Sequence, residues 1–202
     1  MRLFLAVLLV LAAATPAAAS PATTAFLLEP DDVPSQRHPE VAVTYAVGIK
    51  GDVGADLATF RRTAARVLSD HDGWAAAGRV EFVPSRRAPD FRLWLAAPDS
   101  VAAANSECDA DFSCRVGDDI YINAQRWRLA TDTYRHRSLA QYRRYVINHE
   151  VGHWLGLDHA ECYGVGEQAP LMLQQSKDLQ GCDARATPRA EELREALVNL
   201  RR

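Results

Sequence analysis

The sequence lacks several features that mark other classes of protein. After the first twenty residues it has no long hydrophobic run, which excludes a second membrane-spanning segment. The formal net charge is only -3, and this balance argues against a nucleic-acid-binding surface. The four cysteines include no C-x-x-C pair, which argues against a cysteine-ligated zinc site. No internal repeat is present either, so the 202 residues are expected to form one globular domain.

The only hydrophobic run lies at the N-terminus, over residues 3–14, directly after a basic residue. Small residues follow at 17–19, a pattern typical of a secretory signal peptide over residues 1–19. An uncleaved N-terminal anchor is the alternative. Residues 20–40 contain four prolines and predict an extended leader before a domain over 41–202. The mature protein is therefore expected to be secreted, with no stable insertion in a membrane.

The cysteines are expected to form disulfides, because export exposes an even number of thiols to oxidising conditions. Four cysteines can pair in three ways. We favour Cys108–Cys114 and Cys162–Cys182, because the members of each pair are close in sequence. The second bond would clamp the segment that follows His159.

Apolar periodicity predicts a domain that begins with strands and helices and ends in an irregular part. The expected strands cover residues 41–47, 80–83, 91–95 and 120–123. The expected helices cover residues 55–69, 138–155 and a last stretch from Pro188 to about Leu200. Ser138 and Gln141 match a capping box at the start of the second helix. This order is typical of an α+β fold.

Residues 127–137 are interpreted as a polar, basic connection between two of these elements. Together with neighbouring residues they contribute to a stretch rich in arginine. We expect this stretch to be a solvated surface, or else a contact for an anionic wall polymer or an acidic substrate. Its members are Arg126, Arg128, Arg135, Arg137, Arg143 and Arg144.

Residues 149–159 read H-E-x-x-H-x-x-G-x-x-H. Helical residues four apart share a face, so His149 and His153 can direct two imidazoles to one point. Gly156 can adopt the left-handed conformation that ends a helix, which would return His159 as a third ligand. Three protein ligands leave the fourth tetrahedral position of zinc for water. The motif therefore predicts a catalytic Zn²⁺ site.

The chemistry of such a site assigns a role to Glu150. Zinc can lower the pKa of a water from 15.7 to about 7. Glu150 would accept the proton of that water during attack on a carbonyl and pass it to the leaving amine. The histidines must be neutral to bind metal, so activity is expected to fall below about pH 6. The other three histidines, His38, His71 and His136, lie in polar surroundings and are expected to be solvated.

Met172 is the only methionine after the first residue, and it lies in a short turn-like segment. Its thioether could form an apolar floor under the imidazoles. The histidine motif followed by this methionine resembles the metzincin clan of zinc metallopeptidases. The likeness extends, over most of residues 40–183, to a secreted actinobacterial family known as a domain of unknown function. It is carried by Gly78–Phe82, Asp90–Arg92, Tyr142–His153 and Pro170–Cys182.

The resemblance implies a metzincin-like zinc-peptidase domain with a twisted sheet, a backing helix, an active-site helix and a Met turn at Met172. It implies zinc on His149, His153 and His159, with Glu150 as the base. It also implies that an edge strand such as 120–123 pairs with an extended peptide.

The sequence departs from the metzincin pattern in two places. Some metzincins have a tyrosine two residues after the methionine, where this chain has Gln174, so no role is carried over to it. The charged residues 183–202 have no counterpart. We expect a monomeric, secreted zinc endopeptidase that acts on peptide or protein substrates. The alternatives are a zinc amidase acting on cell-wall or other non-protein amides, and a non-catalytic binding domain stabilised by zinc.

Overall fold

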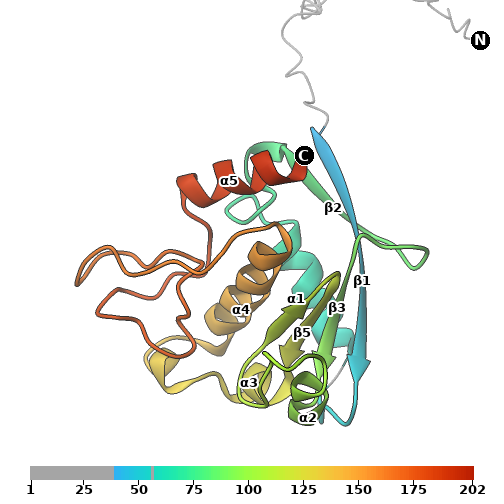
Figure 1. Cartoon of the computed structure of the whole chain (residues 1–202), viewed down its shortest axis with the longest axis horizontal. Helices are drawn as coiled ribbons and strands as arrows, with labels where there is room; N and C mark the ends of the chain where they lie inside the picture. Colours follow the sequence, from blue (N-terminus) through green and yellow to red (C-terminus); the bar gives the residue numbers. More distant parts are fainter. Residues whose placement is uncertain (1–38, 56) are drawn as a thin grey trace, which may run out of the picture. The chain divides into compact units, whose positions relative to one another are not determined.

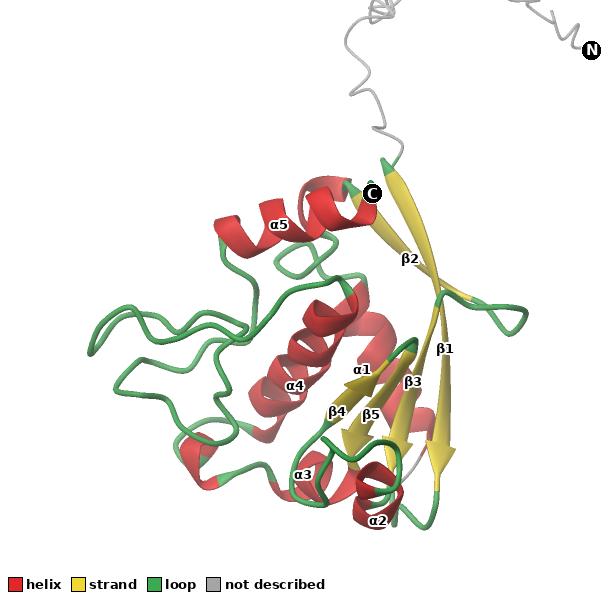
Figure 2. Cartoon of the chain, in the orientation of Figure 1, coloured by secondary structure: helices red, strands yellow, loops and turns green. Residues whose placement is uncertain are grey.

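The computed structural model describes residues 39–55 and 57–202. The expected signal peptide, His38 and nearly all of the proline-rich leader lie outside the described residues. The described part belongs to one compact unit, an α+β fold with a single five-stranded sheet (Figures 1 and 2). Its elements, in chain order, are β1 (Val41–Lys50), α1 (Leu57–Leu68), η2 (Ala76–Gly78), β2 (Val80–Pro84), β3 (Phe91–Ala96), α2 (Pro98–Ala102), β4 (Cys114–Val116), β5 (Asp119–Asn123), α3 (Ala124–Leu129), η3 (Asp132–Tyr134), α4 (Leu139–Trp154) and α5 (Ala190–Leu200).

The sheet has the strand order β2-β1-β3-β5-β4. β1 pairs in parallel with β2 and β3, β3 pairs in parallel with β5, and only β4 runs antiparallel to its neighbour. The expectation that residues 120–123 form an edge strand is therefore wrong, because β4 covers that side of β5. A two-residue loop joins β4 to β5, with Gly117 in the left-handed region at φ 57°.

One face of the sheet carries the main hydrophobic core. α1 and α4 lie together on this face (Figure 1). α1 buries Phe60, Ala64, Val67 and Leu68, which recur at helical spacing and so form one apolar stripe. Tyr142, Tyr145 and Val146 of α4 pack into the same core from the other helix. This packing holds α4 at a fixed place beside β5 and β4.

The interpretation of residues 127–137 as a polar connection is wrong. They include the second half of α3 and all of η3, and they bury Trp127 and Tyr134 almost completely. The Trp127 ring meets Phe60 edge-on at a centroid distance of 4.9 Å, and the Tyr134 hydroxyl donates to Gln175 at 2.9 Å. Arginines on both sides of these two aromatics give the segment its polar composition, although its two largest residues belong to the core.

Three further expectations about local structure are confirmed. α4 begins after Ser138 with the expected capping box, in which the Ser138 hydroxyl accepts from the Gln141 amide and the Gln141 side chain accepts from the Ser138 amide. Both favoured disulfides, Cys108–Cys114 and Cys162–Cys182, are present. His71 and His136 are exposed. Within residues 39–55 and 57–202, no helix has the length and apolar character needed to cross a bilayer.

Candidate metal centre

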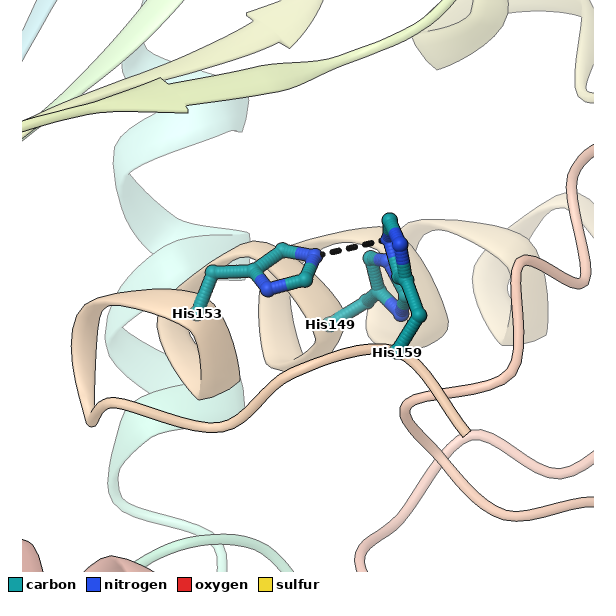
Figure 3. A group of neighbouring side chains, drawn as sticks. All are labelled: His149, His153 and His159. Carbon is teal, nitrogen blue, oxygen red and sulfur yellow. Dashed lines mark hydrogen bonds between the residues drawn. The ribbon is translucent and has the colours of Figure 1, made fainter. Parts of the chain in front are cut away.

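Two of the three motif histidines lie on the last turns of α4, and the third follows its end (Figure 3). Gly156 ends the helix in the left-handed region, at φ 83°, as its place in the motif predicts. The Leu157 amide donates to the Gly152 carbonyl at 3.0 Å, which turns the chain back along the helix. The turned segment then brings His159 beside His149 and His153.

The structure brings the three imidazoles into one group. One ring nitrogen from each of His149, His153 and His159 lies within 4.8 Å of the other two. Nε2 of His153 and Nε2 of His159 are 3.0 Å apart (Figure 3). These three histidines are the only group of three or more metal-ligating side chains found among the described residues.

Backbone carbonyls fix the tautomer of the two helical histidines. Nδ1 of His149 lies 3.0 Å from the Leu171 oxygen, and Nδ1 of His153 lies 2.9 Å from the Leu157 oxygen. A carbonyl can only accept, so each Nδ1 carries a proton and each Nε2 keeps its lone pair. The lone pairs of these two Nε2 atoms are therefore available to a metal.

The donor set fits a divalent ion of the zinc type. Two nitrogens that bind one zinc at about 2.0–2.1 Å lie about 3.4 Å apart at the tetrahedral angle, which small side-chain rotations can reach from the observed spacing. Metal-binding histidines commonly donate Nδ1–H to a carbonyl or a carboxylate, as His149 and His153 do here.

Burial keeps these histidines in the neutral form that binds metal. It lowers the pKa of His149 to about 3, with a further contribution from His153. It also lowers the pKa of His153 and of His159. Their neutral forms therefore persist to a lower pH than the value of about 6 expected from the sequence.

Glu150 lies in the same cavity as the three imidazoles. Glu150 is only 5% exposed. Burial raises the pKa of its carboxyl to about 8, and the positive charges of Arg115 and Lys177 act in the opposite direction. Within the described residues, no protein group donates a hydrogen bond to this carboxyl. A buried carboxyl without a protein partner, placed beside three potential metal ligands, is suited to exchange protons with a molecule in the cavity.

The cavity has a volume of about 280 Å³ and three walls. α4 provides one wall. The loop closed by Cys108–Cys114, together with Arg115 of β4, provides the second. The segment after Met172, from Gln174 to Lys177, provides the third. The sequence indicated no role for the cations Arg115 and Lys177. A Gly-Asp pair between short β-rich stretches is a hairpin signal, and it could have revealed β4 and so Arg115.

Met172 is buried and lies against α4 between the two helical ligands. A Cβ added to Gly152 would stand only 2.4 Å from the Met172 sulfur and 3.0 Å from a carbon of the Trp74 ring. The next residue toward the N-terminus, Leu171, supplies the carbonyl that accepts from His149. The methionine segment thus contacts both the backbone of the helix and one of its ligands.

Gly152→Ala is expected to destabilise the protein, because the added methyl has no space. Alanine normally favours a helix over glycine, but overpacking of a close-packed core costs about 1–3 kcal/mol. Chemical denaturation should show this loss in the free energy of unfolding. Gly164→Ala is the control, since its Cβ would meet only Glu167, at 3.5 Å. Equal stability of the two variants would contradict the packing of Met172 against Gly152.

The sequence also did not indicate the part that α5 plays at this site. Glu192 is buried and accepts from the Leu171 amide at 3.2 Å, the Met172 amide at 2.8 Å and the Arg189 amide at 2.7 Å. Asn199 donates to the Leu155 and Gly156 carbonyls, both at 3.1 Å. α5 therefore holds the turn at Met172 with one side chain and the end of α4 with another.

Gln175 holds the same turn from its other side. It is fully buried, and its amide nitrogen donates to the Pro170 and Arg185 carbonyls, both at 2.9 Å. Its oxygen accepts from the Tyr134 hydroxyl and from the Arg185 amide. All of its hydrogen-bonding capacity is used within the protein, so it fixes the shape of the turn and does not act in the cavity.

One family model covers most of the described residues. No curated protein matches the chain. The family described as "Protein of unknown function (DUF3152)" matches residues 17–194, a range that contains all three histidines, Glu150, Met172 and Glu192. This match covers most of the chain, and the protein belongs to the DUF3152 family.

Proposed function

We propose that this protein is a secreted, zinc-dependent endopeptidase with a metzincin-like fold. The observation that carries the proposal is the buried carboxyl of Glu150, which has no hydrogen-bond partner among the described residues and shares a cavity with three convergent imidazoles. An ion held only for stability would not need an uncommitted acid beside it. The two disulfides support export, because such bonds persist mainly in oxidising compartments.

His149, His153 and His159 would hold the ion. Leu171 and Leu157 orient the first two rings through their carbonyls. The ion would supply Lewis acidity toward a water and toward the scissile carbonyl oxygen. Glu150 takes one proton from the attacking water as the new C–O bond forms. It then gives this proton to the amine nitrogen as the C–N bond breaks, so that one peptide and one water yield a carboxylic acid and an amine. Met172 would provide the apolar floor beneath the rings.

An extended substrate has an available strand to pair with. β4 is the edge of the sheet next to the cavity, and Arg115 at its centre lines the cavity wall. Unpaired backbone groups on an edge strand can bind a peptide as an additional strand. With residues 120–123 inside the sheet, we assign this role to β4.

The proposal is tested by digesting a broad peptide library with oxidised, zinc-loaded protein and identifying the products by mass spectrometry. Internal cleavage that a chelator abolishes and added zinc restores is the expected result. Absence of cleavage in every peptide would reject the proposal. Release of amide-linked wall fragments with no peptide cleaved would instead favour the amidase alternative.

Zinc is expected to stabilise the folded protein, because only the folded chain brings the three ligands together. At a free concentration of 100 times Kd, binding adds about 2.7 kcal/mol to the free energy of unfolding. For a domain of this size, this raises Tm by about 5–10 °C. His153→Ala should abolish the shift, whereas His136→Ala, on an exposed histidine, should keep it. A zinc-induced shift of full size in His153→Ala would contradict the assigned ligands.

A further inference from the structure

A second hollow, of about 930 Å³, opens beside the metal cavity. The two share Phe112, Ser176 and Lys177, so they meet along this line of residues. Its other walls come from α3, η3 and the start of α4, around the yellow segment of Figure 1. We call it the arginine hollow, because four of its lining residues are arginines: Arg126, Arg128, Arg135 and Arg137.

Positive charge dominates the arginine hollow. With Lys177, its lining carries five cationic side chains against one carboxylate, that of Asp132. Within the described part of the chain, only Arg126 of these five pairs with a carboxylate, that of Asp111. Four charges have no carboxylate partner among the described residues, although Nε of Arg135 donates to the His136 ring at 3.0 Å. These four belong to Arg128, Arg135, Arg137 and Lys177.

Aromatic side chains fix this arrangement. Trp127 and Tyr134 anchor α3 and η3 in the core, and their arginine neighbours stay at the surface. Phe112 contacts two of the cations. The Lys177 nitrogen lies 5.2 Å and the Arg126 guanidinium 5.7 Å from the centre of its ring. Cations within about 6 Å of an aromatic face are attracted to it, so Phe112 holds positive charge where the two hollows meet.

Lys177 links the arginine hollow to the reacting groups. Lys177 lines both hollows, and its side-chain nitrogen lies over the ring of Phe112, which also lines both. A ligand in the arginine hollow would therefore be continuous with one at the metal centre.

We propose that the arginine hollow binds acidic side chains of the peptide substrate, on one side of the bond that is cleaved. This inference rests on the proposed peptidase function and adds a substrate class to it. Guanidinium groups bind carboxylates through paired hydrogen bonds, and four uncompensated cations favour a run of acids over a single one. The continuity of the two hollows favours a peptide over an anionic polymer, because the molecule in the arginine hollow must also carry the scissile amide.

The test uses peptides that share one cleavable core. Each peptide carries one flank of Glu, Gln or Lys residues. The flank precedes the core in one set of peptides and follows it in the other set. The zinc-loaded full protein should cleave the Glu peptide, in one of the two placements, with a kcat/KM about tenfold above that of the Gln peptide. The advantage should shrink as salt is raised, because exposed charges are screened beyond a Debye length of about 8 Å at physiological ionic strength.

Charge-reversal variants locate the preference. Arg135→Glu combined with Arg137→Glu should reduce the Glu-to-Gln ratio of kcat/KM to near one. Arg86→Glu combined with Arg87→Glu makes the same change of net charge in the loop between β2 and β3, which lines neither hollow, and should leave the ratio unchanged. Should the first pair impair folding, Arg135→Gln with Arg137→Gln removes the charges without reversing them.

Binding to a non-cleaving variant separates this inference from the peptidase proposal. Zinc-loaded Glu150→Gln protein should bind a fluorescent Glu-flanked peptide more tightly than a Gln-flanked one, as measured by anisotropy. Acid-selective binding with no cleavage by wild type would reject the peptidase and keep the acidic site. Cleavage without preference among the three flanks would keep the peptidase and reject the acidic site. Tighter binding of a polyphosphate of matched charge than of the Glu-flanked peptide would also reject the acidic site, since the hollow would then be a docking site for polyanions.

Discussion

Glu150→Gln is expected to lower kcat for peptide cleavage by about a thousandfold, because general acid–base catalysis contributes about 10²–10⁴ to such rates. The amide has the shape of the carboxylate but cannot accept a proton from water or return one to the leaving amine. The three imidazoles are unchanged, so zinc should bind with similar affinity. The measurement is a comparison of kcat for one fast peptide, with zinc content determined on the same samples.

Stability separates a catalytic loss from a folding defect in this variant. In the metal-free protein, burial raises the pKa of Glu150 from 4.5 to about 8, so the folded state resists loss of a proton that the unfolded state loses readily. A raised carboxyl pKa makes folding less favourable as pH increases from about 4.5 to 8. The neutral glutamine has no such penalty, and metal-free Glu150→Gln should be at least as stable as wild type at pH 8.

Glu167→Gln is the matched control, because it makes the same chemical change on an exposed residue that lines neither hollow. It should retain wild-type kcat. Wild-type cleavage by a zinc-loaded Glu150→Gln protein would exclude Glu150 as the base and would favour an amide-binding or purely structural role for the site.

The elements that the sequence predicted well depend on neighbours in the chain. Residues 149–159 specify a helix, a left-handed glycine and a returning histidine within three turns, so their geometry follows from local backbone rules. The capping box at Ser138 and the two disulfides likewise join residues at most twenty positions apart. Local periodicity also reveals the long strands, because alternating burial leaves a readable pattern in β1 and β3.

The errors occur where contacts join distant residues. Three-residue β4 is too short for a periodic signal, and its pairing alone places β5 inside the sheet. Trp127 lies between two arginines in sequence and Tyr134 precedes another, and only their packing against Phe60 and Gln175 shows that they are core residues. The average composition of a segment does not show which of its residues are buried. The burial of each residue depends on the residues that pack against it in space.

Glu192 is the clearest example of a residue whose role sequence patterns could not assign. It lies in a helix with charged neighbours and resembles an ordinary first-turn acid, since it does reach back to the Arg189 amide. Its two other hydrogen bonds go to Leu171 and Met172, about twenty residues away. Through the Leu171 carbonyl, the same peptide segment bonds His149. The carboxylate therefore positions a metal ligand that it does not contact.

Glu192→Ala is expected to lower the free energy of unfolding by about 4 kcal/mol, because hydrogen bonds to a charged group contribute about 1.5–3 kcal/mol each and their loss leaves buried amides unpaired. For a domain of this size, Tm should fall by about 8–16 °C. Zinc affinity, measured well below the lowered Tm, should also decrease by about 10–100-fold, since groups that orient ligands contribute this much.

Glu192→Gln should fall between wild type and alanine, because one oxygen remains as an acceptor while the new amide group faces a backbone N–H. Glu195→Ala, on the exposed side of α5, should leave both Tm and zinc affinity unchanged. A purely structural Glu192 would lower Tm without weakening zinc binding in the folded protein, and that result would contradict its role in positioning His149.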